Sequence, residues 1–253
     1  MTDEARVAFI IAGVQKAGTT ALFDYLGDEA GLALSREKEV HFFDDEAGDW
    51  ARPDYGAYHA NFPPPDGRPR GEATPIYLYW PNSLERIQAY NPAMKLIVVL
   101  RDPVMRAWSH WKMEYARGVE THPFAWCIRE GRQRLFAAEA AGGSRPWGFD
   151  REVSYVERGF YGEQIERLYG LFPRDQVLLL TSEGLRTDPG AALADVRAFL
   201  GLPKGVRPVA REAHVGREMD YGADLTAQDI AHLRAVYARD AARLADLTGI
   251  RFG

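Results

Sequence analysis

The sequence predicts an α/β fold: a single domain in which a central parallel sheet is flanked by helices. Three short apolar runs, rich in β-branched residues, are typical of fully buried strands. Segments with helical spacing separate these runs, as in a parallel sheet with both faces covered. The 253 residues contain no internal repeat and no linker long enough to separate domains. We therefore expect one domain over residues 1–253.

The first strand and the first helix are expected near the N-terminus. Residues 7–14 (VAFIIAGV) form the first apolar run, and residues 21–26 (ALFDYL) have helical spacing and end before Gly27. A short glycine-containing turn, QKAGTT, joins them. Strand, turn and helix in this order are typical of the beginning of a βα unit.

A second buried strand is expected over residues 95–100, followed by an amphipathic helix over about residues 104–117. Pro103 suits the first turn of that helix, where its missing N–H costs nothing. The remaining expected elements are a helix over 161–172, a strand over 177–180 and helices over 190–200 and 226–247.

Three segments between these elements are irregular. Residues 62–70 (FPPPDGRPR) are predicted to be neither helix nor central strand. Residues 141–150 (AGGSRPWGFD) are predicted to be a surface loop, and residues 201–221 a long loop of the kind that is often functional.

The composition excludes several classes of protein. A formal net charge of −5 argues against a nucleic-acid binder, which needs excess positive charge to neutralise phosphates. The single cysteine, Cys127, excludes an internal disulfide framework and a multi-cysteine zinc site, and we expect a buried or half-buried structural thiol in a helix. No run approaches the roughly 20 apolar residues that span a membrane, and the N-terminus has no signal-peptide pattern. These features predict a cytoplasmic protein.

The turn after the first strand is a candidate anion site, because the free N–H groups and the dipole of a helix N-terminus point at the same place. Gly13 and Gly18 have the separation of the glycines in a nucleotide triphosphatase P-loop, but Thr19 stands where that motif requires lysine. No clear acidic residue ends a neighbouring strand to hold Mg²⁺. A metal-free transfer from a nucleotide-like donor fits better, with Lys16 beside the bridging oxygen and Thr19, Thr20 and the loop amides on the phosphate. The alternative is a solvated lysine in a structural turn.

A second candidate phosphate site follows the strand over residues 95–100. Arg101 ends that strand and Ser109 lies about two turns into the next helix, where it could face a ligand above the strand ends. An arginine and a hydroxyl together suit the binding of a second phosphate, because both donate hydrogen bonds to its oxygens. The alternative is an Arg–Asp helix cap.

The segment KEVHFFD, residues 38–44, contains a candidate general base. On an extended backbone Glu39 and His41 would share one face with Phe43, while Asp44 would lie on the other face. A carboxylate and an imidazole that close would supply a general base for a substrate hydroxyl. The alternative is an edge strand anchored by phenylalanine, with its polar residues outward.

Five segments in this order resemble the sulfotransferases that use 3′-phosphoadenosine-5′-phosphosulfate (PAPS), in the branch that contains heparan sulfate sulfotransferases and bacterial relatives. The segments are GVQKAGTTALFDYL, KEVHFFDDE, EATPIYLYW, KLIVVLRDPVMRAWSHW and FLGLP. The resemblance implies a P-loop-like domain that transfers a sulfuryl group from PAPS to a hydroxyl of a small-molecule, lipid or glycan acceptor. It also implies an in-line displacement without a metal.

The resemblance implies a role for each matching residue. The first loop of the family binds the 5′-phosphosulfate, and its positions here are Lys16, Ala17, Gly18, Thr19 and Thr20. The RDP…S motif binds the 3′-phosphate, which implies Arg101 and Ser109. The base of the family matches Glu39, with His41 as the second candidate and Asp44 as a neighbour in the site. A late basic loop that closes over the 3′-phosphate corresponds to Gly216 and Arg217.

The sequence also departs from that family. Relatives that act on glycosaminoglycans often have lysine before the T-P-x-Y motif, where this chain has Ala73, and the late loop lacks the usual cysteine pair. These departures favour a smaller or less acidic acceptor. Two other functions stay open at this point, namely a P-loop-like kinase of a small alcohol and a non-catalytic nucleotide-binding protein. Eight aromatic residues are candidates for an acceptor pocket: Trp50, Tyr55, Tyr58, Tyr77, Tyr79, Trp80, Trp108 and Trp111.

Overall fold

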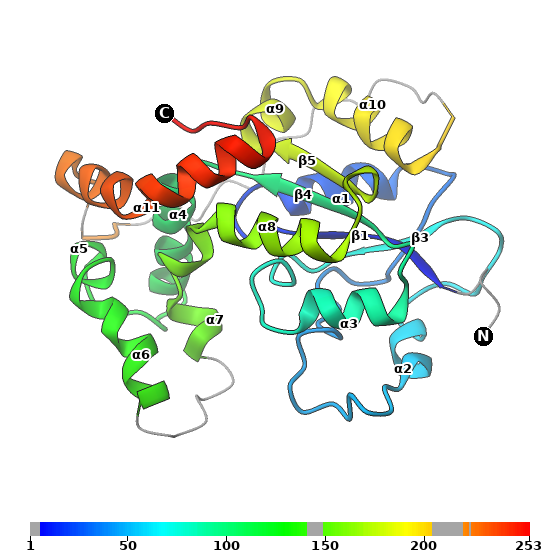
Figure 1. The fold of residues 1–253 in the computed structure, drawn as a ribbon, viewed down its shortest axis with the longest axis horizontal. Helices are drawn as coiled ribbons and strands as arrows, with labels where there is room; N and C mark the ends of the chain where they lie inside the picture. The colour runs from blue at the N-terminus through cyan, green and yellow to red at the C-terminus, as the bar shows by residue number, and fades with distance from the viewer. Residues whose placement is uncertain (1–5, 141–148, 204–219, 223) are drawn as a thin grey trace. The chain divides into compact units, whose positions relative to one another are not determined.

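A five-stranded parallel sheet forms the centre of the fold in the computed structural model, which describes residues 6–140, 149–203, 220–222 and 224–253 (Figure 1). The strands lie in the order β2-β3-β1-β4-β5, and every neighbouring pair is parallel. Their bounds are β1 Val7–Gly13, β2 Ala33–Leu34, β3 Arg70–Ala73, β4 Lys95–Leu100 and β5 Val177–Thr181. Helices flank the sheet, which confirms the predicted fold class.

The apolar strands form where the sequence predicts them. β1 and β4 occupy the centre of the sheet, and most of their side chains are fully buried. Parallel strands buried on both faces read as continuous apolar runs, so the three runs located them within two residues.

The sequence pattern does not predict β3, although this strand lies inside the sheet, between β2 and β1. The irregular segment predicted over residues 62–70 is wrong at its last residue, because Arg70 already belongs to β3. This strand has the sequence RGEA, and its Arg70 and Glu72 are 2% and 0% exposed. A Cβ at Gly71 would lie 2.1 Å from the ring of Phe9 on β1, so a glycine is needed for this close approach. A strand with two charges and a glycine has no apolar pattern to recognise.

Eleven α-helices lie in the described part of the chain. They are α1 Thr19–Gly27, α2 Tyr55–His59, α3 Ser83–Tyr90, α4 Pro103–Ala116, α5 Phe124–Cys127, α6 Gln133–Ala140, α7 Phe149–Val153, α8 Tyr161–Leu171, α9 Ser182–Thr187, α10 Pro189–Leu200 and α11 Ala227–Thr248. All five predicted helices are present. The surface loop predicted over residues 141–150 ends earlier, because α7 begins at Phe149, and residues 141–148 lie outside the described residues.

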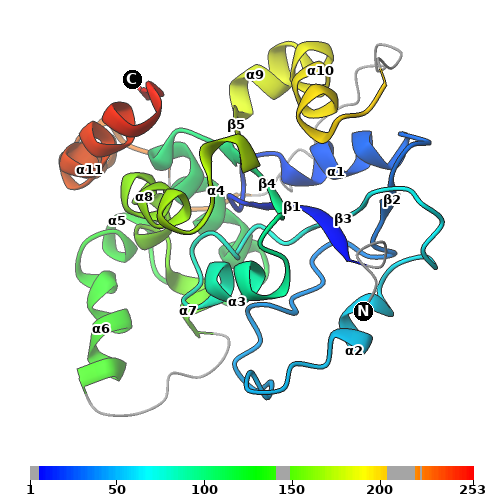
Figure 2. The same ribbon diagram turned by 45° about the vertical axis from the view of Figure 1, so that its right-hand side comes forward.

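The chain divides into two compact units. Residues 1–100 and 167–214 make up the first, and residues 101–166 and 215–253 the second. The first unit contains the whole sheet, with α1 and α10 on one face and α3 on the other (Figure 2). The single domain over residues 1–253 stays a prediction.

The second unit has its own core. Its buried apolar side chains come from α4, α5, α6, α7, α11 and the segments between them, and they include Trp111, which is fully buried. Cys127 belongs to this core, and burial raises the pKa of its thiol. The prediction of a buried structural thiol is therefore confirmed.

Candidate active site

The loop between β1 and α1 presents an uncapped helix N-terminus. Gly18 is the N-cap of α1 with φ 95°, in the left-handed region that favours glycine, and no side chain caps the helix. The first turn of α1 also contains no acidic residue. Because the first N–H groups of a helix have no partner within it, this end of α1 is suited to hold an anion.

The predicted phosphate-binding residues lie together on this loop and helix. Ala17 and Thr19 are buried, Thr20 is half-buried and Gly18 is exposed. Lys16 is half-buried and has φ 70°, a left-handed backbone that costs a non-glycine residue roughly 1–2 kcal/mol. The predicted βα turn is therefore present, and Lys16 occupies its strained position.

Glu39 lies at the same edge of the sheet as this loop. Its backbone N–H donates a 2.9 Å hydrogen bond to the carbonyl of Ala73, the last residue of β3. Ala73 is paired in register with Ile11 of β1, two residues before that strand ends at Gly13. Because β3 and β1 are parallel neighbours, the carboxyl ends of both strands meet at one edge.

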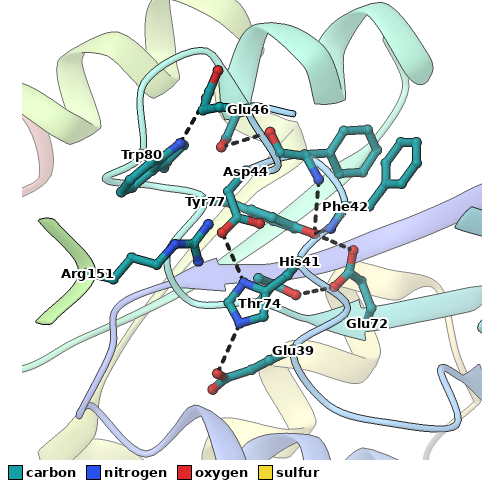
Figure 3. A network of polar contacts seen from close by, with 12 residues as sticks. Glu39, His41, Phe42, Asp44, Glu46, Glu72, Thr74, Tyr77, Trp80 and Arg151 are labelled. Carbon is teal, nitrogen blue, oxygen red and sulfur yellow. Dashed lines mark hydrogen bonds and ion pairs between the residues drawn. The ribbon is translucent and has the colours of Figure 1, made fainter. Parts of the chain in front are cut away.

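His41 lies between two carboxylates (Figure 3). Its Nδ1 is 2.9 Å from Oδ2 of Asp44, and its Nε2 is 3.5 Å from Oε2 of Glu39. Asp44 is 0% exposed, whereas the Glu39 side chain is 43% exposed. The buried carboxylate on one ring nitrogen orients the imidazole so that its other nitrogen faces Glu39.

The predicted alternation of this segment is wrong. Glu39 has φ 65° and His41 has φ 53°, so the backbone is left-handed at both residues rather than extended. His41 therefore contacts Asp44, which an extended strand would place on the opposite face. The alternative of an edge strand is wrong as well, because the segment forms no strand.

In the first unit, the candidate catalytic residues are among the residues with a left-handed backbone. Among the described residues, four other than glycine have a positive φ: Lys16, Glu39, His41 and Asn82. Three of these four are the residues that sequence reasoning proposed for catalysis. Such backbone positions persist only when the surrounding structure holds them, and they cluster at functional sites.

Charged neighbours keep Glu39 ionised. Burial opposes its ionisation, but the hydrogen bond with His41 and the positive charge of Lys38 outweigh burial and lower the pKa of Glu39 to about 2. The ammonium of Lys38 also donates a hydrogen bond to Oε1 of Glu39. Glu39 is therefore a carboxylate across the whole physiological pH range.

The backbone beside His41 is held from three directions. Both Phe42 and Phe43 donate their backbone N–H to the hydroxyl of Tyr77, at 3.0 and 3.4 Å. The carbonyl of Phe43 accepts hydrogen bonds from the hydroxyl of Ser83 at 3.2 Å and the guanidinium of Arg86 at 2.9 Å, both on α3. The Phe43 side chain is fully buried. These contacts anchor the residues that separate His41 from Asp44.

Beneath this segment lies Glu72, which the sequence analysis did not select. It accepts hydrogen bonds from the hydroxyls of Tyr58 at 2.8 Å, Thr74 at 2.5 Å and Tyr77 at 3.3 Å. Burial raises the pKa of Glu72 to about 7, although the three hydroxyls lower it, and the negative charge of Asp44 adds to the increase. The only signal in the sequence was a glutamate just before the T-P-x-Y motif.

We expect Glu72→Gln to remove a pH dependence from the stability of the protein. Between the ordinary pKa of 4.5 and the folded pKa of about 7, the unfolded chain has released the proton of Glu72 while the folded chain keeps it. Stability from this group is therefore complete below pH 4.5 and falls by about 3 kcal/mol as the pH rises through about 7. Urea unfolding of both proteins at about pH 5 and about pH 8 measures this difference. A difference independent of pH would contradict the raised pKa.

Arg101 and Ser109 belong to the second unit. Arg101 follows β4 directly, and Asp102 caps α4 by accepting hydrogen bonds from the N–H of Val104 and of Met105. The helix predicted over about residues 104–117 is thus confirmed, with Pro103 in its first turn. Ser109 is half-buried on α4. Burial and the positive charge of the nearby Arg106 both lower the pKa of Arg101, so a bound anion would be stabilised beside it.

The remaining candidate residues lie in the protein core or outside the described residues. Gly216 and Arg217 lie outside the described residues. Of the eight aromatic residues considered for an acceptor pocket, Tyr58, Tyr77 and Trp111 are fully buried in the protein core. Within the described ranges, no three side chains of His, Cys, Asp or Glu gather to hold a metal ion. No helix in those ranges is long and apolar enough to span a membrane.

Comparison with solved structures places the fold among sulfotransferases. A sulfotransferase from Alicyclobacillus acidocaldarius is 26% identical, with a TM-score of 0.79 over 98% of this chain and 97% of that one. A mouse sulfotransferase in complex with PAP is 14% identical, with a TM-score of 0.52 over 96% of this chain and 86% of that one. The second likeness concerns the fold alone.

Comparison of sequences leads to the same group. Human heparan sulfate glucosamine 3-O-sulfotransferase 3B1 is 32% identical over 198 residues, which are 77% of this chain and 46% of that protein. Human bifunctional heparan sulfate N-deacetylase/N-sulfotransferase 3 is 26% identical over 206 residues, 77% of this chain and 22% of that protein. The chain thus spans about half the length, or less, of these curated relatives. The sequence model described as "Sulfotransferase domain" matches residues 7–215, and the chain therefore belongs to the sulfotransferase domain family.

Proposed function

We propose that this protein transfers a sulfuryl group from PAPS to a hydroxyl group of an acceptor by a metal-independent in-line displacement. The observation that carries the proposal is the edge of the sheet where two candidate residues meet: Lys16 follows β1 at the uncapped N-terminus of α1, and Glu39, beside His41, is hydrogen-bonded to the end of the neighbouring strand β3. Membership of the sulfotransferase domain family supports this assignment over a kinase or a non-catalytic protein.

Each candidate residue has a task in this reaction. Glu39, or His41 as the second candidate, accepts the proton of the acceptor hydroxyl as its oxygen attacks sulfur. The new oxygen–sulfur bond forms while the bond from sulfur to the phosphate oxygen breaks. Lys16 neutralises the charge that develops on this departing oxygen and donates a proton to it. The amides of residues 18–20 hold the oxygens of the phosphosulfate, whereas the N–H of Ala17 donates to the carbonyl of Val14 at 3.2 Å.

The second phosphate of the donor is assigned to the second unit. Arg101 would pair with the 3′-phosphate and Ser109 would donate a hydrogen bond to it, as the matching motif of the family implies. The lowered pKa of Arg101 supports this assignment, because an anion would relieve the cost of its burial. Gly216 and Arg217 are proposed to close over the same phosphate.

The acceptor is proposed to be a small molecule, a lipid or a glycan. The relatives named above carry heparan sulfate in their names, with both O- and N-sulfotransferases among them. A carboxylate base suits a hydroxyl better than an amine, which favours O-sulfation here. Glycosaminoglycan enzymes often have lysine at the position of Ala73. The alanine, which is fully buried at the end of β3, supplies no positive charge for an acidic acceptor. A cytoplasmic location stays a prediction.

The proposal is tested by calorimetric titration with 3′-phosphoadenosine 5′-phosphate (PAP) and with 5′-AMP, both in EDTA. We expect clear binding of the bisphosphate and much weaker binding of AMP. Equal or absent binding would contradict the assigned donor. Activity that is lost in EDTA would point to a kinase, and binding without any role for Lys16 or Glu39 would point to a non-catalytic protein.

Arg101→Ala is expected to weaken PAP binding by about ten- to 100-fold, because one charge-assisted contact to phosphate contributes about 1.5–3 kcal/mol. The affinity for AMP should stay unchanged, since AMP has no 3′-phosphate. Calorimetry with both nucleotides on both proteins measures this. An unchanged affinity for PAP would show that the 3′-phosphate lies elsewhere.

A further inference from the structure

A buried carboxyl group lies under the segment that holds the candidate base, and the mechanism above does not use it. Glu72 is 0% exposed and accepts three hydroxyl hydrogen bonds, from Tyr58 on α2, from Thr74 and from Tyr77 (Figure 3). Burying a charge is costly even when it is paired. An apolar residue would fill this place at lower cost, so the carboxyl group calls for another explanation.

The hydroxyl of Tyr77 connects Glu72 to the segment above it. This hydroxyl has one proton, and it donates that proton to Oε1 of Glu72. The oxygen of the same hydroxyl then accepts hydrogen bonds from the backbone N–H groups of Phe42 and Phe43. These two residues are the whole connection between His41 and Asp44.

We propose that Glu72 is a positioning residue, which orients the Tyr77 hydroxyl and thereby holds the backbone that presents His41 and Glu39. The proposal rests on the proposed function, because it assigns Glu72 to the same site. A left-handed backbone at His41 and Glu39 needs such support, because it persists only when neighbouring groups hold it. Glu72 contacts neither reacting group and acts through Tyr77.

The ionised form of Glu72 is the form that supports this arrangement. Tyr58 and Tyr77 both donate to Oε1 of Glu72, whereas Thr74 donates to Oε2, so a proton on Oε2 makes only the Thr74 hydroxyl reverse. Protonation also removes the charge that strengthens the bond from Tyr77. The titratable groups that face Glu72 are Tyr58, Tyr77 and Asp44, and both tyrosines stay neutral because burial raises the pKa of each well above its ordinary value. The bond from Tyr77 is therefore weaker when the pH is below about 7.

Tyr77→Phe tests the connection, with Tyr90→Phe as a matched control. Tyr90 is also a buried tyrosine, and its hydroxyl accepts the backbone N–H of Val7 at 2.8 Å instead of those of Phe42 and Phe43, while its ring packs against Phe43 and is kept in the variant. We expect Tyr77→Phe to increase amide hydrogen exchange at Phe42 and Phe43 by at least about fivefold, as the loss of one hydrogen bond implies. Tyr90→Phe should leave both amides unchanged. Equal exchange at these two amides in the two variants would overturn the proposal.

A pH series separates positioning by Glu72 from a merely structural role. In the wild type, overall stability rises as the pH is lowered through about 7, whereas the protection of the Phe42 and Phe43 amides should fall relative to that of the core amides of β1. Glu72→Gln keeps an oxygen toward both tyrosines and cannot ionise, so the step should disappear although His41 is still present. Tyr58→Phe removes one donor that lowers the pKa and should move the step to higher pH. A step that persists unchanged in Glu72→Gln would overturn the proposal.

The same samples keep this inference apart from the proposed function. PAP affinity, measured by calorimetry, should be equal in the wild type, Tyr77→Phe and Glu72→Gln, because the donor contacts lie on other residues. Wild-type protein that does not bind PAP would overturn the proposed function while leaving the amide measurements valid. Wild-type binding with unchanged amides in Tyr77→Phe would overturn the positioning role alone.

Discussion

Lys16→Ala is expected to lower kcat by about 100- to 1,000-fold while changing the affinity for PAP far less. This range is typical when one preorganised donor to the developing charge of a transition state is removed. The ammonium of Lys16 interacts most strongly with the departing oxygen when the bond to sulfur breaks, so its loss raises the barrier more than it weakens ground-state binding. Single-turnover kinetics with PAPS, beside calorimetry with PAP, separates the two effects.

Lys16→Arg is the matched control for this prediction. Arginine keeps the positive charge at the end of the loop but does not release a proton near neutral pH. We expect an intermediate kcat, because charge neutralisation is kept and proton donation is lost. Near-normal kcat in Lys16→Ala would show that Lys16 is only a solvated residue of the turn.

Glu39→Gln is expected to lower kcat by about 100- to 10,000-fold, the usual contribution of a positioned general base. Glutamine keeps the shape of the side chain and loses the ability to accept a proton. Glu46→Gln is a suitable control, since Glu46 follows in the same segment and contacts Trp80 and Arg86 instead of His41. It should lose far less activity than Glu39→Gln, because Glu46 contacts neither Glu39 nor His41 and acts on the segment only through Arg86, which also holds the carbonyl of Phe43.

The pH profile of activity, together with the variants Glu39→Gln and His41→Gln, decides between the two candidate bases. A pKa of about 2 keeps Glu39 ionised at all working pH values, so Glu39 by itself produces no loss of activity between pH 5 and pH 8. An acid limb in this range therefore belongs to His41 or, through positioning, to Glu72. If Glu39→Gln keeps near-normal turnover and His41→Gln does not, His41 is the base and Glu39 is its partner.

Much of the fold is predictable from the preferences of short stretches of the sequence. Apolar runs predicted the three strands β1, β4 and β5, because strands buried on both faces have few polar positions. The turn at Gly18 and the start of α4 at Pro103 follow from the backbone preferences of single residues. Local reasoning also proposed Lys16 and the pair Glu39 and His41; the family resemblance then put Glu39 before His41, and the match over residues 7–215 agrees with that family.

Tertiary structure alone decided how the candidate base is presented. The inner strand β3 has no apolar pattern, because Arg70 and Glu72 are charged and yet buried, and one partner of Glu72 is Tyr58, 14 residues earlier in the chain. The left-handed backbone at Glu39 and His41 contradicts local preference, and contacts with Ala73, Tyr77 and α3 hold the segment in place. A pattern reports what a residue prefers by itself, whereas this site depends on neighbours that are distant in sequence and overrule that preference.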